Sequence, residues 1–360
     1  METVIIGTFL RDEASVSTYS LAMAKEFVNL GYKVIVITVE RRTDLVDMNS
    51  NPIILTWPSF GASKFTDFLF LQNLIKKHNV KMLIGNFAAV NYFMIVGWMF
   101  RVPHRIAWIH TMSEQMIDVP KWKFYRKKYI YKLATKIIAN SNATKNDAMN
   151  TFHIDERKID VVPNLLKNND FYISSDKMFK IVFVGRLHYS KGVDILIKAL
   201  KVLVEEFPNI LLEIIGSGDQ KVYIELVKSY DLEDNINFLG KLPMKQVLHH
   251  LATAQFSVVP SREEAFGYTV IESFSVQTPV IGSNTGGIKD IIKDKINGFL
   301  FPVGNHIQLA QKMSYCLKNE KLLNKLSRAS YDSYKNNYAL ENNIKDVVSM
   351  LDKNMKLIQK

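Results

Sequence analysis

The sequence predicts two doubly wound α/β domains that face one another across a cleft. Short β-rich runs alternate with helical patterns through the first half of the chain. The same alternation starts again after a polar stretch at residues 164–175, which is rich in Asn and Ser and shows no periodicity. With 360 residues, 48% of them hydrophobic, the chain is long enough to bury two cores.

In the first half, strands are expected at 4–6, 34–39, 81–84, 105–109, 136–139 and 159–162. The first helix has one apolar face made by Val16, Met23, Phe27 and Leu30, and further helices are expected at 87–100 and near 120–133. This is the order of repeated βαβ units, so the strands should form a parallel sheet.

In the second half, strands are expected at 181–184, 211–215, 236–238, 256–259, 280–281 and 299–301, with a helical tail from 308 onward. The predicted boundaries are a first domain at 1–165, a linker at 166–178, a second domain at 179–335 and a C-terminal helix at 336–360 that could pack back on the first domain.

Composition and the N-terminus indicate a cytoplasmic protein. The single Cys316 lies in an apolar helical pattern and excludes an internal disulfide framework or a cysteine-based zinc site. Residues 1–10 lack the basic start of a signal peptide. The longest apolar run, 87–100, is shorter than the roughly 20 residues that a spanning helix needs.

The residues suited to chemistry each follow a predicted strand of the second half, in four groups at 185–192, 216–218, 264–272 and 285–290. Carboxyl ends of parallel strands meet at one edge of the sheet, where such folds bind ligands. Arg186 and Lys191, with a helix starting near Lys191, would suit a diphosphate. Glu264 and Glu272 would then bind the rest of a nucleotide sugar. The two carboxylates alone also fit a general acid/base pair. A single cation after a strand is also commonly a solvated surface charge.

Seven motifs over residues 180–302 resemble the C-terminal half of family 4 glycosyltransferases of the GT-B fold, in which two Rossmann-like domains face across a cleft. They are Val184-Gly185-Arg186-Leu187, Lys191-Gly192-Val193-Asp194, Pro260-Ser261, the 264–272 segment, Thr278-Pro279-Val280, Thr285-Gly286-Gly287 and Asn297-Gly298-Phe299. In the first half, Asn140-Ser141-Asn142-Ala143 and Val161-Val162-Pro163-Asn164 fit the family more loosely.

The resemblance implies a retaining transfer of sugar from a nucleotide-diphosphate donor, expected to be a UDP-sugar, with no cofactor and no essential metal. The first domain would bind a glycan or lipid-linked acceptor, and bacterial surface polysaccharide is the expected product class. It also implies site roles: Arg186 and Lys191 bind the diphosphate, Glu272 the ribose, Glu264 lies beside the sugar, and the backbone of Phe266, Gly267 and Tyr268 meets the phosphates and sugar.

His110 follows a predicted strand where family members often carry a histidine near the transferred sugar, so it could bind the donor or move a proton. A partly buried structural histidine is the alternative. The chain also departs from the family pattern. It has Arg11-Asp12-Glu13-Ala14-Ser15 in place of a Gly-Gly pair, Gln277 in place of a glycine, and Ala265 beside Phe266.

Net charge is +11, and residues 101–136 hold nine Lys or Arg against Glu114 and Asp118. In a helix at 120–133, Trp122, Tyr125, Tyr129 and Leu133 form one stripe, which we expect to face the core. We expect the opposite face to be exposed and to contact an acceptor or an anionic membrane at the inner leaflet: Lys121, Phe124, Lys127, Lys128 and Tyr131. An ordinary solvated basic helix is the alternative.

Three other functions share some of these sequence features. Basic charge with aromatic residues also fits nucleic acid, but the chain carries no recognised binding module. An NAD-dependent dehydrogenase would need a G-x-G-x-x-G loop after the first strand, where Gly7 stands alone. A non-catalytic nucleotide-sugar-binding protein would share the same site and differ only in lacking turnover.

Overall fold

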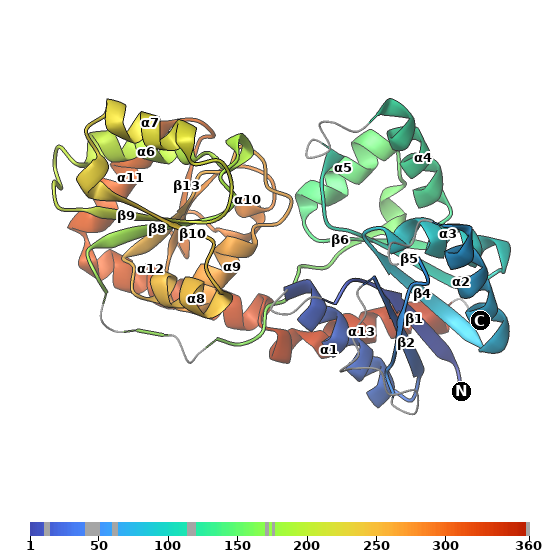
Figure 1. Ribbon diagram of the computed structural model, residues 1–360. Helices are drawn as coiled ribbons and strands as arrows, with labels where there is room; N and C mark the ends of the chain where they lie inside the picture. Colours follow the sequence, from blue (N-terminus) through green and yellow to red (C-terminus); the bar gives the residue numbers. More distant parts are fainter. Residues whose placement is uncertain are drawn as a thin grey trace. The chain divides into compact units, whose positions relative to one another are not determined.

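The computed structural model describes residues 1–10, 15–39, 51–59, 64–113, 120–169, 173–174 and 177–357. It divides into two compact units (Figure 1). The first unit comprises Met1–Lys167 together with Leu340–Lys360, and the second comprises Asn168–Ala339. The C-terminal helix therefore belongs to the first unit.

The described part of the first unit is a seven-stranded parallel sheet with helices on both faces, in strand order β3-β2-β1-β4-β5-β6-β7. The strands are β1 (Thr3–Gly7), β2 (Lys33–Thr38), β3 (Ile53–Thr56), β4 (Val80–Asn86), β5 (His104–Ile109), β6 (Lys136–Ala139) and β7 (Ile159–Val161). The helices are α1 (Ser15–Asn29), α2 (Phe65–Lys77), α3 (Ala89–Met99), α4 (Lys121–Lys132), α5 (Asn142–Phe152) and α13 (Leu340–Leu357).

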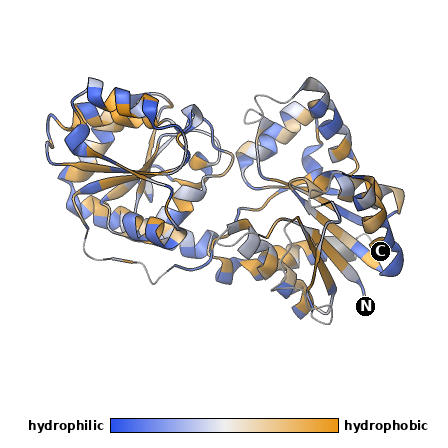
Figure 2. Cartoon of the chain, in the orientation of Figure 1, coloured by the Kyte–Doolittle hydropathy of each residue, from blue (hydrophilic) through white to orange (hydrophobic). Residues whose placement is uncertain are grey.

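Alternate residues of these strands enter two separate cores. Val4 and Ile84 pack with α1 and α13 on one face, whereas Ile5 and Leu83 pack with α2 to α5 on the other. Because both faces are covered, most residues of the strands are apolar, which is typical of parallel sheets (Figure 2). The Tyr32 hydroxyl also donates a hydrogen bond of 2.6 Å to Asp352, which fastens α13 to this unit.

The described part of the second unit is a six-stranded parallel sheet in the order β10-β9-β8-β11-β12-β13. Its strands are β8 (Lys180–Val184), β9 (Leu211–Ile215), β10 (Ile236–Gly240), β11 (Phe256–Val259), β12 (Val280–Ser283) and β13 (Gly298–Phe301). Its helices are α6 (Val193–Leu203), α7 (Lys221–Ser229), α8 (Met244–Ala252), α9 (Tyr268–Ser275), α10 (Ile288–Ile291), α11 (His306–Lys318) and α12 (Glu320–Asn337).

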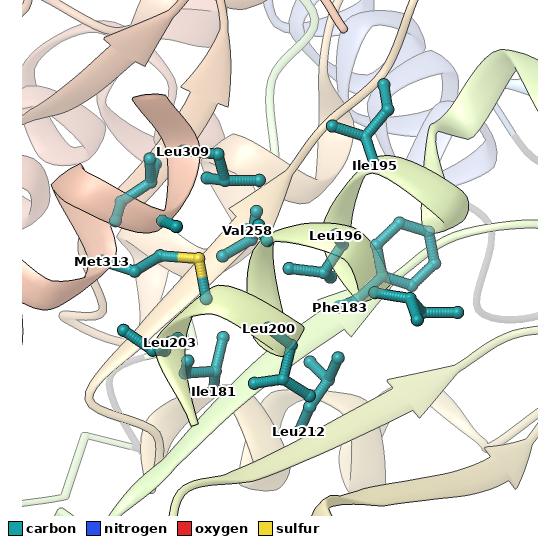
Figure 3. Packing of buried hydrophobic residues seen from close by; sticks show 14 of the residues in the cluster. Ile181, Phe183, Ile195, Leu196, Leu200, Leu203, Leu212, Val258, Leu309 and Met313 are labelled. Carbon is teal, nitrogen blue, oxygen red and sulfur yellow. The ribbon is translucent and has the colours of Figure 1, made fainter. Parts of the chain in front are cut away.

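The main core of the second unit lies between this sheet and α6 and α11. Figure 3 shows Leu196 and Leu200 of α6 and Met313 of α11 gathered around the strand residues Ile181 and Val258. Cys316 is buried in the same cluster, as its helical pattern predicts. A smaller cluster on the opposite face packs α8 against the sheet.

The predicted fold class is confirmed, since each unit is an α/β layer structure with a parallel sheet. Strand β3 is an addition that the sequence analysis did not assign; it is an edge strand of four residues and only partly buried. Among the described residues, no helix has both the length and the apolar composition required to cross a membrane.

The predicted orientation of α4 is wrong. Tyr125 and Tyr129 are 65% and 64% exposed, whereas Tyr131 is 2% exposed and Phe124 packs against the core. Ile130 is also buried, and burying it turns its neighbour Tyr131 inward, where the Tyr131 ring meets Phe152 edge-on at 5.3 Å. Aromatic residues lie all round this helix, so its periodicity marks no single apolar face.

Candidate active site

Four loops of the second unit leave the sheet at the same edge. They follow β8, β9, β11 and β12, which run parallel and pair in the order β9-β8-β11-β12. These are the loops that carry the four groups of residues singled out by the sequence. The structure therefore brings Arg186, Lys191, Glu264 and Glu272 to one edge of one sheet.

Two glycines let these loops approach closely. A Cβ atom on Gly216 would lie 1.7 Å from the carbonyl oxygen of Gly185, and one on Gly286 would lie 1.8 Å from that of Glu264. The N–H of Gly287 also donates a hydrogen bond of 2.8 Å to the Glu264 carbonyl oxygen. The backbone carrying Glu264 is thus fixed by the loop that follows β12.

Lys191 and Glu264 form an ion pair, with 2.5 Å between Lys191 Nζ and Glu264 Oε2. The two side chains are only 18% and 16% exposed, so the pair is partly shielded from water. An anionic ligand would compete with the carboxylate for the lysine. The sequence predicted both residues at the site but not this contact.

Glu272 is buried in α9, with 7% of its surface exposed. Desolvation, followed by the negative charge of Glu264, raises the pKa of Glu272 to about 7. Burial likewise raises the pKa of the neighbouring Tyr268 hydroxyl above its usual range. A buried carboxyl group with such a pKa is typical of functional sites, since a ligand's hydroxyl groups can supply the hydrogen bonds that the protein does not.

Arg186 follows β8 and is exposed, and it forms no ion pair with any residue in the described part of the chain. Its guanidinium is therefore available to a ligand. Phe266 is buried against Tyr268, with 5.4 Å between the ring centroids. Gly267 has a φ of 110° and is the N-cap residue of α9, whose first N–H groups have no partner within the helix.

A second ion pair, between Arg262 and Asp194, joins the loop after β11 to the first turn of α6 and was not predicted. The two guanidinium nitrogens donate to the two carboxylate oxygens at 2.8 Å each. Arg262 also lies over the Tyr189 ring at 3.7 Å from its centroid. This bidentate pair fixes the turn that carries Lys191. Spacing could not have revealed it, because the partners are 68 residues apart in the sequence.

The departures from the family pattern have different outcomes. Gln277 takes a φ of 62°, a left-handed conformation that glycine adopts more easily, so the chain keeps the turn without the glycine. Ala265 is buried. Residues 11–14 lie outside the described residues, as do Glu114 and Asp118.

The remaining predicted residues belong to the first unit. His110 follows β5, and its ring stacks on Phe87 with centroids 4.4 Å apart. Asn86 donates through Nδ2 to the Gly7 carbonyl oxygen at 3.1 Å, which turns its Oδ1 toward His110 Nε2 at 2.9 Å. Nε2 therefore carries the proton. Desolvation lowers the pKa of His110 to about 3, so the ring is neutral at physiological pH. Asn86 was missed because a strand-end asparagine carries no motif of its own.

Of the predicted residues in α4, Lys127 and Lys128 are partly exposed and Phe124 and Tyr131 turn inward. The side chain of Lys121 lies outside the described ones.

Two family models match adjoining parts of the chain. The model for glycosyl transferases group 1 matches residues 167–333, and the model for glycosyltransferase family 4 matches residues 16–166. The chain belongs to the family 4 glycosyltransferases of the GT-B fold.

Curated relatives match this chain over different lengths. An uncharacterised glycosyltransferase of Methanocaldococcus jannaschii is 29% identical over 55% of this chain and 56% of its own length. An uncharacterised glycosyltransferase of Haemophilus influenzae is 25% identical over 86% of this chain and 87% of its own. The gpi3 subunit of phosphatidylinositol N-acetylglucosaminyltransferase of Schizosaccharomyces pombe is 22% identical over 82% of this chain and 68% of its own. The chain thus spans little over half of the first of these relatives.

Solved structures share the fold at low identity. Anabaena HepE in complex with UDP aligns over 98% of this chain and all of its own, with a TM-score of 0.79 and 16% identity. TarM aligns over 100% of this chain and 99% of its own, with a TM-score of 0.77 and 13% identity. These neighbours show the GT-B fold.

Proposed function

We propose that this glycosyltransferase takes a sugar from a UDP-sugar, with retention of configuration, and passes it to a glycan or lipid-linked acceptor in the synthesis of a bacterial surface polysaccharide. The observation that carries the proposal is the meeting of Arg186, Lys191 and the buried Glu272 at one sheet edge. Two neighbours of the same fold support it by their ligands and names: Anabaena HepE was solved with UDP-glucose, and WaaB is a lipopolysaccharide outer core galactosyltransferase.

The proposed chemistry assigns the leaving-group charge to the two cations. As the bond between sugar and diphosphate breaks, negative charge grows on the phosphate oxygens while the sugar becomes oxocarbenium-like. Arg186 is already free of a carboxylate partner among the described residues, and Lys191 would exchange Glu264 for the diphosphate. The nucleoside diphosphate leaves readily, so no strong general acid is required.

That exchange gives the two carboxylates different proposed roles. Released from Lys191, Glu264 would face the transferred sugar as an anion close to the developing positive charge. Glu272 would accept hydrogen bonds from the ribose hydroxyls. These hydrogen bonds would replace the ones that water makes to an exposed carboxylate and that burial of Glu272 removes. His110 would act as a neutral ring near the sugar, either binding it or taking part in proton transfer. Backbone N–H groups at 266–268 would meet the phosphates.

Hydrolysis of a panel of nucleotide sugars by the purified protein tests the function. We expect slow release of UDP from one donor, and we expect Glu264→Ala to lower turnover chiefly while Glu272→Ala chiefly weakens UDP binding. No turnover with any donor, despite tight UDP binding, would indicate a non-catalytic binding protein instead. We also propose that no metal takes part, because the two cations can carry the charge; a loss of activity on dialysis against EDTA would contradict this.

We further propose that the enzyme is cytoplasmic and attaches to the inner face of the membrane through the exposed aromatic face of α4, which consists of Trp122, Tyr125 and Tyr129. Their exposed fractions are 57%, 65% and 64%, and cations accompany them: Lys123 and Arg126 lie over Trp122, and Lys132 lies over Tyr129. Aromatic rings interleaved with cations are typical of helices at an anionic interface.

Flotation with anionic liposomes at low salt tests the attachment. We expect the wild-type protein to float and the double variant Trp122→Ala/Tyr129→Ala to stay in solution. Tyr315→Ala removes an aromatic ring that is 53% exposed in the second unit and serves as the control. Failure of the wild-type protein to float would refute the attachment and leave the proposed reaction intact.

A further inference from the structure

A cavity of about 240 Å³ lies wholly within the first unit, where β4 and β5 end and α4 begins. Phe87 and His110, the residues that directly follow these two strands, line it. The polar side chains of Asn91 and Thr111 also reach its wall. The cavity is therefore at the carboxyl edge of the first sheet, the edge at which parallel α/β sheets bind ligands.

Helix α4 contributes three cations to this cavity: Lys123, Arg126 and Lys127. Lys123 and Lys127 are one helical turn apart and lie on the same stripe as the buried Tyr131. Among the described residues that line the cavity, none is an aspartate or a glutamate. In the described part of the wall, these three cations concentrate positive charge next to aromatic rings.

Lys127 shows what this burial does to a cation. Its ammonium group lies 5.6 Å from the Tyr131 ring centroid and 5.7 Å from that of Phe152. Desolvation lowers the pKa of Lys127, and the charge of Asp147 opposes that effect. Asp147 also accepts hydrogen bonds from the Ser113 N–H at 2.8 Å and from the Thr151 hydroxyl at 2.8 Å. A ligand anion would restore the stabilisation that burial takes from the lysine.

We infer that this cavity binds a phosphate group carried by the acceptor, with Lys123, Arg126 and Lys127 as its cationic contacts. The inference rests on the proposed function, because it assigns the cavity to the substrate that receives the sugar. A phosphate carries nearly two negative charges and several acceptor oxygens, which suits three cations and the Thr111 hydroxyl better than a single carboxylate would. The neutral His110 beside the cations adds no further positive charge.

The phosphate could belong to a soluble sugar phosphate or to a lipid headgroup, and two probes distinguish these sources. Both are used with protein saturated with UDP, so that Arg186 and Lys191 are already occupied. Glycerol phosphate is titrated by calorimetry, and vesicles containing phosphatidic acid are used in flotation. The variants are Lys123→Glu, Arg126→Glu and the milder Arg126→Gln, all at exposed helix positions. Lys25→Glu is the matched control, since Lys25 is exposed on α1 of the same unit and neither lines the cavity nor belongs to α4.

We expect each cavity variant to weaken binding of one of these probes at least about tenfold, as for loss of one charge-assisted contact. The UDP affinity of every variant, and the probe affinity of Lys25→Glu, should be close to the wild-type values. Binding of glycerol phosphate would indicate a soluble acceptor, and binding of vesicles alone would indicate a lipid headgroup. If neither probe binds, or if Lys25→Glu weakens binding as much as Arg126→Glu, the inference is overturned. Absence of UDP binding would count against the proposed function alone, and the titration would then be repeated without UDP.

Discussion

Replacing the buried Glu272 with glutamine should stabilise the protein while weakening its binding of UDP. In the folded chain the pKa of Glu272 is raised from 4.5 to about 7 by desolvation and by the charge of Glu264. The folded state therefore holds a proton that the unfolded chain has already lost between these two pH values. Stability must fall as pH rises through this window, because the folded state binds more protons than the unfolded state.

The size of the effect follows from the shift in pKa. A change from 4.5 to about 7 corresponds to about 3 kcal/mol of lost stability once the pH exceeds the folded value. Glutamine cannot ionise and has nearly the same shape, so Glu272→Gln removes the loss. We expect the variant to be more stable by up to about 3 kcal/mol near pH 8 and by under about 1 kcal/mol near pH 5.

Urea denaturation followed by far-ultraviolet circular dichroism measures this difference. All four tryptophans, Trp57, Trp98, Trp108 and Trp122, lie in the first unit, so tryptophan fluorescence reports that unit and reveals whether the second unfolds separately. Glu225→Gln, at an exposed position of α7, is the control. If the free energy of unfolding changes by the same amount between pH 5 and pH 8 in the wild-type protein and in Glu272→Gln, Glu272 does not have a raised pKa and the reasoning is refuted.

Three further predictions concern the same sheet edge. The affinity for UDP should decrease by up to about tenfold per pH unit below about pH 7, because ribose hydroxyls favour the ionised Glu272, and Glu272→Gln should remove this dependence. Arg186→Ala and Lys191→Ala should each lower kcat by about 10² to 10³, as for loss of one transition-state donor, with the fold retained. Gly286→Ala should destabilise the protein by more than about 1 kcal/mol, because its φ is 45° and its Cβ would meet the Glu264 carbonyl oxygen.

Each of these has its own control. Isothermal titration calorimetry from pH 5 to 8 measures the UDP affinity, and an affinity that does not change with pH in the wild-type protein would contradict the first prediction. For the second prediction, steady-state kinetics measures kcat and circular dichroism checks the fold, with the exposed Lys221→Ala as the control. Near-normal turnover in Arg186→Ala and Lys191→Ala would show that these cations do not stabilise the transition state. Gly304→Ala is the comparison for Gly286, since Gly304 also has a positive φ, at 79°, but no atom within 4 Å of an added Cβ. Equal losses would show that strain in φ dominates and the close contact does not.

The sequence by itself determined where the strands lie in the chain and which functional residues follow each of them. Apolar runs such as 181–184 and 256–259 are buried on both faces of a parallel sheet, and a fully apolar strand can be recognised from its residues alone. The motifs follow these strands directly, so their meeting at one edge is a consequence of parallel pairing. Loop residues such as Arg186 and Glu264 could be placed before any contact was known.

Only the tertiary structure decided which way α4 turns, which charges pair and how strongly Glu272 is desolvated. The direction of α4 depends on Phe152, a residue of another helix that receives Tyr131. The pair between Lys191 and Glu264 joins residues 73 positions apart, and that between Arg262 and Asp194 joins residues 68 apart. Electrostatic energies depend on distance and on exclusion of water, and both are properties of the packed chain rather than of residue order.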